Sequence, residues 1–404
     1  MTNMIYTAMP ALPKKHHTNA VVLPSEWNTC PLSSIVEEIS ETVGTRKIET
    51  ISISAGIGFV NQAEKFGREL SGKQYEKYIV LHKGDFSYNK GNSNIYPQGC
   101  IYRLNNRTEA AVPNVFESFR VSVGNPDYYE QLFLSGFLNR QLYSKINRGV
   151  RDNGLLNLKG KDFYSCEVPY PPLAEQERIA EILIQCDRVI ELKEQKLDEL
   201  KQLKKEFLRK MFPAKGCDTP EIRFPGFTGA WEQRKLGELS SVFKSGDFIS
   251  ASEIAETGKY PVFGGNGLRG FTDRYNHDGE YALIGRQGAL CGNVNYSVGK
   301  SYFTEHAIAV KAGKANETRF LYYLFSTMNL GQYSGQSAQP GLAVGNLIAL
   351  ENVVPNKAEQ SKISSILTAL DTLITLHQRE LEETKTYKKT LAKLLLTGIV
   401  RVQG

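Results

Sequence analysis

The chain has 404 residues, which at about 150 residues per domain predicts two or three domains. Hydrophobic residues make up 41% of the chain and charged residues 23%, so the composition excludes a disordered chain or a fibrous repeat. The net charge of +6, from 49 basic and 43 acidic residues, is spread along the chain. No segment is a basic block that would bind nucleic acid by charge alone.

Membrane insertion and secretion are not expected, because the sequence has no run of 18 apolar residues and no apolar signal region near its start. Its six cysteines include no Cys-x-x-Cys pair, so no structural zinc or other metal site is predicted. Unpaired thiols at scattered positions are typical of a reducing compartment, and we expect a cytoplasmic protein.

The most informative feature of the sequence is an internal repeat. The segment from Pro171 to Ile179 recurs from Pro355 to Ile363, at an offset of 184 (355 − 171). Trp27 similarly recurs as Trp231, at an offset of 204 (231 − 27). Each half is therefore a globular block followed by a helical block. The predicted division is an N-terminal segment 1–26, a first block 27–171, a helix 172–212, a linker 213–227, a second block 228–355, a helix 356–397 and a tail 398–404.

In chain order, the first block contains a strand-like apolar run at Tyr78–Leu81 and an amphipathic helix at Tyr128–Asn139. The second block contains a strand-like run at Tyr281–Ile284 and a helix at Arg319–Met328. We therefore expect mixed α/β blocks.

The two helical blocks follow a proline and contain no internal glycine or proline for some forty residues. Apolar residues recur at steps of three and four, which is typical of a coiled coil. Two such helices from one chain pack most simply antiparallel, related by a pseudo-twofold axis, and a rod of roughly 60 Å would suit a spacer. Packing of each helix only on its own block is the alternative. The predicted interface residues are Ile179, Leu183, Ile190, Leu197, Leu200, Phe207, Ile363, Leu367, Leu370, Ile374, Leu381 and Leu391.

Motifs for catalysis are weak. Asn125-Pro126-Asp127-Tyr128 resembles the Asn-Pro-Pro-Tyr tetrad of adenine methyltransferases, but it lacks the second proline and suits a turn. Ser54–Phe59 lacks the acidic residue that a nucleotide-binding glycine loop requires. No P-loop or metalloprotease motif is present. No catalytic residue is therefore assigned.

Glycine-rich stretches with amide and basic side chains occur in both blocks and could contact DNA, because amides pair with adenine and arginine pairs with guanine. A plain glycine-rich hairpin is the alternative for each stretch. The candidate DNA-binding residues are Tyr88, Asn89, Lys90, Ser93, Asn94, Gly264, Gly265, Asn266, Gly267, Arg269, Arg286 and Gln287.

The repeated Pro-x-x-x-Glu-Gln-x-x-Ile helix openings, together with Tyr260–Gly270 and Ile284–Asn293, resemble the specificity (S) subunits of Type I restriction–modification enzymes. The resemblance runs from about Trp27 to Thr397. It implies two α/β target recognition domains separated by two long antiparallel helices. It also implies a non-catalytic subunit that reads a bipartite, asymmetric site in double-stranded DNA, together with two methyltransferase (M) subunits and restriction/translocase (R) subunits.

The resemblance implies no cofactor in this chain, and places S-adenosylmethionine in the M subunits, which would methylate adenine N6. Residues 1–26 lack the Arg-Phe-Pro-Gly-Phe segment that precedes the second block at Arg223–Phe227. How the first block begins is therefore left open. A free-standing adenine methyltransferase and a coiled-coil scaffold that binds protein are the alternative functions.

Overall fold

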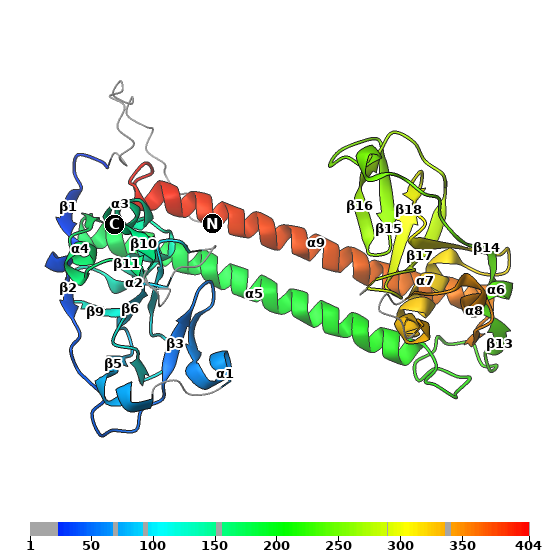
Figure 1. Ribbon diagram of the computed structural model, residues 1–404, viewed down its shortest axis with the longest axis horizontal. Coiled ribbons are helices and arrows are strands. Elements are labelled where there is room, and N and C mark those ends of the chain that lie inside the picture. Colours follow the sequence, from blue (N-terminus) through cyan, green and yellow to red (C-terminus); the bar gives the residue numbers. More distant parts are fainter. Residues whose placement is uncertain are drawn as a thin grey trace. The chain divides into compact units, whose positions relative to one another are not determined.

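The computed structural model describes residues 23–67, 72–91, 96–150, 156–288, 290–335 and 341–403. The chain divides into two compact units, residues 1–192 with 381–404 and residues 193–380. This division cuts both long helices, because each globular block shares its core with segments of both. Figure 1 shows the elements of each unit.

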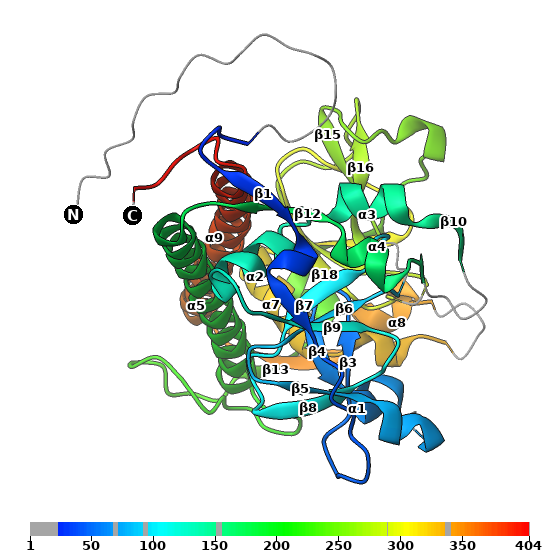
Figure 2. The same cartoon turned by 90° about the vertical axis from the view of Figure 1, so that its left-hand side faces the viewer.

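The first unit is built on a four-stranded sheet of order β2-β9-β6-β7, and its other strands form the antiparallel pairs β1-β12, β3-β4, β5-β8 and β10-β11. Figure 2 shows β1 beside β12. The strands are β1 (Asn28–Pro31), β2 (Val36–Glu38), β3 (Ile51–Ser54), β4 (Gly58–Asn61), β5 (Ile79–His82), β6 (Phe86–Asn89), β7 (Cys100–Arg103), β8 (Glu109–Val112), β9 (Glu117–Val121), β10 (Asn147–Val150), β11 (Leu156–Asn157) and β12 (Glu167–Tyr170). The α-helices are α1 (Gln62–Phe66), α2 (Pro126–Leu134), α3 (Asn139–Lys145), α4 (Gly160–Tyr164), the first part of α5 (Leu173–Met211) and the last part of α9 (Lys357–Leu396).

The second unit repeats this plan with a four-stranded sheet of order β14-β20-β17-β18, the pair β13-β21, and a further sheet of order β16-β15-β19. The strands are β13 (Glu232–Lys235), β14 (Ser240–Ser245), β15 (Tyr260–Gly264), β16 (Gly267–Thr272), β17 (Glu280–Gly285), β18 (Val294–Val298), β19 (Tyr302–Phe303), β20 (Ala307–Ala312) and β21 (Glu351–Val354). The α-helices are α6 (Leu236–Leu239), α7 (Thr318–Thr327), α8 (Val344–Ile348), the last part of α5 and the first part of α9.

The expected mixed α/β blocks, long antiparallel helices and internal repeat are confirmed. The strand-like runs lie in β5 and β17, and the helix expected at 319–328 is α7. The helix expected at 128–139 ends at Leu134, because Gly136 takes a left-handed φ of 76° before α3 begins. The side chain of Asn125 caps α2 by accepting from the N–H groups of Asp127 and Tyr128. The methyltransferase-like tetrad is thus a helix start.

The seam of the long helices is buried within each unit. Ile190, Phe207, Ile374 and Leu391 are half-buried, and the other eight predicted interface residues are buried. The first turns have a second role, because Ile179 and Leu183 belong to the core of the first block, and Ile363 and Leu367 to that of the second.

Ion pairs fix the register of the antiparallel helices. Lys388 pairs with Asp187 at 2.5 Å in the first unit, and Lys204 pairs with Asp371 at 2.5 Å in the second. These two pairs are equivalent at the offset of 184. Lys204 and Lys388, which interrupt the apolar seam, therefore have acidic partners on the opposite helix, and such pairs specify register.

The repeated Glu-Gln at the helix openings joins each helix to its block. Gln176 donates to the carbonyl of Pro171 at 2.8 Å and accepts from the main chain of Asn125, the residue that caps α2. Gln360 makes the same two bonds, to Pro355 and from Glu317 at the start of α7. One carboxamide thus fixes the angle between a long helix and a short one.

The preceding glutamates are buried and ion-paired. Glu359 accepts two hydrogen bonds from Arg223, at 2.7 and 2.9 Å, and Glu175 accepts two from Arg401, at 2.7 and 2.8 Å. In the second unit the main-chain N–H of Ile222 donates to the carbonyl of Lys210. In the first unit the N–H of Val400 makes the equivalent bond to the carbonyl of Leu394. Arg401 in the C-terminal tail therefore neutralises the buried glutamate of the first helix opening, as Arg223 does at the second.

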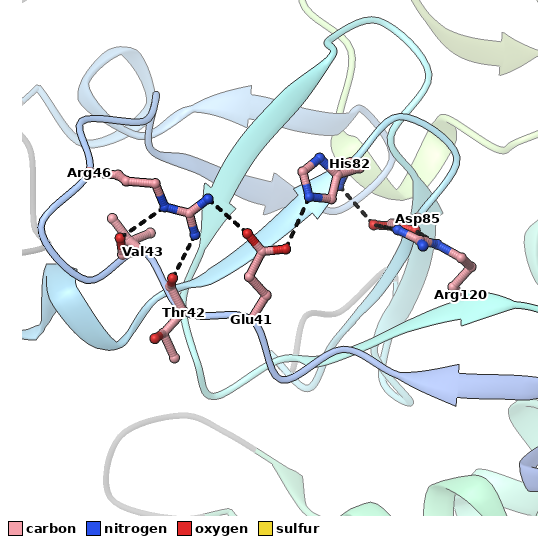
Figure 3. Close-up of polar contacts among 7 residues, drawn as sticks. All are labelled: Glu41, Thr42, Val43, Arg46, His82, Asp85 and Arg120. Carbon is pink, nitrogen blue, oxygen red and sulfur yellow. Dashed lines mark hydrogen bonds and ion pairs between the residues drawn. The ribbon is translucent and has the colours of Figure 1, made fainter.

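A polar network in the first unit holds the turn before β6 (Figure 3). The buried carboxylate of Asp85 accepts from the main chain of His82 at 2.8 Å and from Arg120 at 2.7 and 3.0 Å. His82 also contacts Glu41 at 3.1 Å, and this hydrogen bond, with that from Arg46, keeps the pKa of Glu41 below its usual value. The residue before β6 is thereby bonded to the end of β5 and to β9.

The thiols differ in accessibility. Burial raises the pKa of both Cys100 and Cys166 to about 11, whereas Cys217 is exposed. We expect a thiolate-directed maleimide at pH 7.5 to modify Cys217 first, because the thiolate is the reactive form. Peptide mass spectrometry of the folded chain measures the order, and modification of Cys100 or Cys166 before Cys217 would contradict this assignment.

Candidate nucleic-acid interface

The two candidate stretches of the second block meet in space. Strands β15 and β16 join through a turn at Gly264–Gly267, where Gly267 has a φ of 92°. A side chain added at Gly265 would lie 3.1 Å from the carbonyl of His306 and 3.4 Å from that of Gln287. The turn therefore packs against the end of β17, and glycine is needed for this close approach.

Polar side chains gather around this junction, which we call the turn cluster: Asn266, Arg269, Arg286, Gln287 and Asn293. All are exposed except Arg286, which is half-buried. Asn293 donates to Asn266 at 3.3 Å. The guanidinium of Arg286 faces the main-chain carbonyl of Glu305 at 3.5 Å, and no carboxylate in the described part of the chain pairs with it, so its charge can serve another partner.

The remaining glycines shape this cluster. A side chain on Gly264 would come within 2.5 Å of Cδ of Arg269, so its absence lets that side chain cross the turn. Gly264 and Gly267 are themselves buried. They act through the backbone conformation of the turn.

Lys90 and Arg286 stand at equivalent positions. The carbonyl of Lys90 accepts from the main chain of Leu156 at 2.8 Å, and that of Arg286 accepts from Leu342 at 2.9 Å. Each follows a central sheet strand, β6 or β17. The side chains differ, because Lys90 pairs with Glu117 at 2.5 Å and both are largely buried. Lys90 therefore stabilises the sheet, and its charge is already neutralised.

The first-block candidates are only partly at a surface. Tyr88 and Asn89 lie in β6 (Phe86–Asn89), an inner strand of the sheet, and Tyr88 is fully buried with its hydroxyl donating to the carbonyl of Gln98 at 2.7 Å. Tyr88 is thus a core residue, stacked on Phe163. Asn89 bonds to the main chain of Ile53 and Gly91. Ser93 and Asn94 lie outside the described residues.

Sequence reasoning missed two contributors to the turn cluster. Asn293 ends the stretch Ile284–Asn293 but is not among the candidate DNA-binding residues, and neither are Glu305 and His306. Strand pairing of β17 with β20 brings the carbonyls of Glu305 and His306 to Arg286. Only the sheet topology could have shown this. Among the residues that the structure describes, no group of acidic, histidine or cysteine side chains could hold a metal ion, and no helix could cross a membrane.

The repeated blocks and repeated helix openings define a protein with two equivalent modules, each a mixed α/β block joined to a long helix. The model of the Type I restriction modification DNA specificity domain matches residues 24–202 and 229–386, and the chain belongs to this family.

Relatives support the same assignment. The chain is 45% identical over 146 residues to the Type I restriction enzyme EcoprrI specificity subunit of Escherichia coli, covering 35% of this chain and 36% of that protein. It is 24% identical over 292 residues to the MjaVIII specificity subunit of Methanocaldococcus jannaschii, covering 65% and 68%. The crystal structure of the S subunit from M. genitalium shares the fold, with a TM-score of 0.62, 17% identity and coverage of 95% and 98%.

Proposed function

We propose that this chain is the DNA specificity subunit of a Type I restriction–modification complex. In this function each block reads one half of a bipartite, asymmetric site in double-stranded DNA. The observation that supports this proposal is that a whole module is duplicated in a chain of this family. Each copy runs from a tryptophan, Trp27 or Trp231, to the Glu-Gln pair at the start of a long helix. Two equivalent readers suit two half-sites that differ in sequence.

The partners follow from this function. Two methyltransferase subunits would bind S-adenosylmethionine and methylate adenine, and restriction/translocase subunits would join them, all in the cytoplasm. The chain itself would contribute recognition without catalysis and without a cofactor. The experiment is single-molecule sequencing of methylated adenines in cells that carry this chain with its methyltransferase partner. A methylated bipartite motif that disappears on deletion of the chain is expected, and methyl transfer by the isolated chain would contradict the proposal.

The turn cluster is the reader that the geometry favours in the second block. Replacing Arg286 by alanine is expected to relax one base position in one half-site, because an arginine–guanine contact contributes about 1–3 kcal/mol, which is roughly 5- to 150-fold in affinity. Lys90→Ala is the matched control, because Lys90 stands at the equivalent position of the first block and its ammonium group is already paired with Glu117. It should lower stability and leave the motif unchanged. Competition binding of both variants with single-base variants of the motif measures the effect. Discrimination by Arg286→Ala that equals that of the wild-type chain at every base position would contradict the role of Arg286.

A further inference from the structure

Each block carries a β-hairpin outside its four-stranded sheet, and the two hairpins are equivalent. In chain order, β3 and β4 lie between the sheet strands β2 and β6, as β15 and β16 lie between β14 and β17. In the first unit a parallel bridge joins Thr50, before β3, to Ala111 on β8. In the second unit Val262 on β15 pairs in parallel with Tyr302 on β19. The turn between β3 and β4, which lie side by side in Figure 2, therefore corresponds to the turn on which the turn cluster is built.

The backbone of the two turns shows which residues correspond. Each turn closes at a glycine with a left-handed φ, 103° at Gly58 and 92° at Gly267. Ile57 stands directly before the first glycine, and Asn266 of the turn cluster stands directly before the second. Ile57 therefore occupies in the first block the position that Asn266 occupies in the second.

Contacts with the sheet support the same correspondence. Tyr102 on β7 and Asn295 on β18 are equivalent, because each pairs with the residue three positions before Lys90 or Arg286. A side chain added at the closing glycine would lie 3.6 Å from the ring of Tyr102 in the first turn and 2.9 Å from the carboxamide of Asn295 in the second. Both turns thus pack on the same position of their sheet.

The tip of the first turn presents an apolar side chain to solvent. Ile57 is 75% exposed, more than any other large apolar side chain in the described part of the chain. The N–H of Gly56 donates to the hydroxyl of Tyr102 at 3.0 Å. The N–H of Ile57 donates to the carbonyl of Ser54 at 3.0 Å. These bonds hold the tip in place, and the side chains of Ala55 and Ile57 have no polar atom, so these side chains can contact a base through apolar atoms alone.

We propose that Ile57 reads a thymine in the half-site of the first block by contacting its 5-methyl group in the major groove. That methyl group is the apolar feature that base pairs present in this groove, where the other groups are hydrogen-bond donors and acceptors. The contact removes apolar surface of both partners from water. The inference rests on the proposed function, because it takes DNA as the ligand of both blocks. It gives the first block a reader that the buried Tyr88 and the ion-paired Lys90 do not supply.

The test uses the full chain in complex with its methyltransferase partner and duplexes of the methylated motif in which one thymine at a time is replaced by uracil. This replacement removes only the 5-methyl group. We expect the Kd of the wild-type complex to rise about fourfold at one thymine of the half-site read by the first block, which corresponds to the burial of one methyl group. In Ile57→Ala the rise at that thymine should fall below about 1.5-fold, because the two changes remove the same contact.

Val123→Ala is the matched control, because this side chain is also apolar and exposed, at 42%, but follows β9 instead of lying in the turn. It should keep the uracil effect of the wild type. A half-site without thymine, or uracil effects of equal size in the wild type and Ile57→Ala, would overturn the inference. An apolar wedge between base steps would weaken binding of Ile57→Ala to every duplex alike and leave the uracil effect in place, which would also overturn it. Failure of the complex to prefer its motif over unrelated DNA would instead count against the proposed function.

Discussion

Exchanging residues 231–354 for the corresponding block of another family member is expected to change one half of the methylated motif and to leave the other half intact. The exchanged segment begins at Trp231 and ends with β21, so it carries the whole second-block sheet and the turn cluster. The first block keeps its own core, because the residues of that core come from the first unit alone. A recognition surface carried by one module can therefore be replaced without altering the other.

The measurement is the methylated-adenine motif in cells carrying the exchanged chain and its partners. The junctions matter, because Arg223 must still reach Glu359, and both residues lie outside the exchanged segment. Exchange of residues 27–170 is the matched control and should alter the opposite half of the motif. A change in both halves after a single exchange would show that the blocks do not read independently.

Replacing Arg223 by methionine is expected to destabilise the second unit by about 3–5 kcal/mol, because it leaves the carboxylate of Glu359 buried and unpaired. Glu359 is only 1% exposed, and the indole N–H of Trp231 forms no hydrogen bond among the described residues. Arg401→Met should cost less, about 3 kcal/mol, because the guanidinium of Arg401 is a third exposed and the indole of Trp27 still donates to Glu175 at 2.9 Å.

Urea unfolding of the full chain, followed by probes in each unit, measures both effects. Arg46→Met is the control, because its ion pair with Glu41 is exposed and should contribute less than about 1 kcal/mol. The double variant Arg223→Met with Glu359→Leu should recover much of the loss, since a hydrophobic pair avoids the buried charge. Equal stability of the Arg223 variant and the wild type would mean that this ion pair does not hold the helix opening.

The sequence by itself determined the repeated architecture and the long helices. Periodicity is local, so Ile179 to Leu200 and Ile363 to Leu381 could be assigned to a buried seam without coordinates. The repeated Glu-Gln was visible too, although its reason was not. That reason is a hydrogen bond from a distant residue: the N–H of Asn125 donates to Gln176, 51 positions away, and the N–H of Glu317 donates to Gln360, 43 positions away.

Only the tertiary structure decided which candidate residues face outward and which partners they meet. Tyr88 and Lys90 are residue types that often contact DNA. Strand pairing buries Tyr88, however, and places Glu117 beside Lys90, so that the two form an ion pair. The tail residue Arg401 reaches Glu175 across 226 positions and fulfils the role of Arg223, which no local pattern indicates. The physical reason is common to these cases: composition and spacing specify what a side chain can bind, whereas burial and the available partners are set by contacts between segments far apart in the chain.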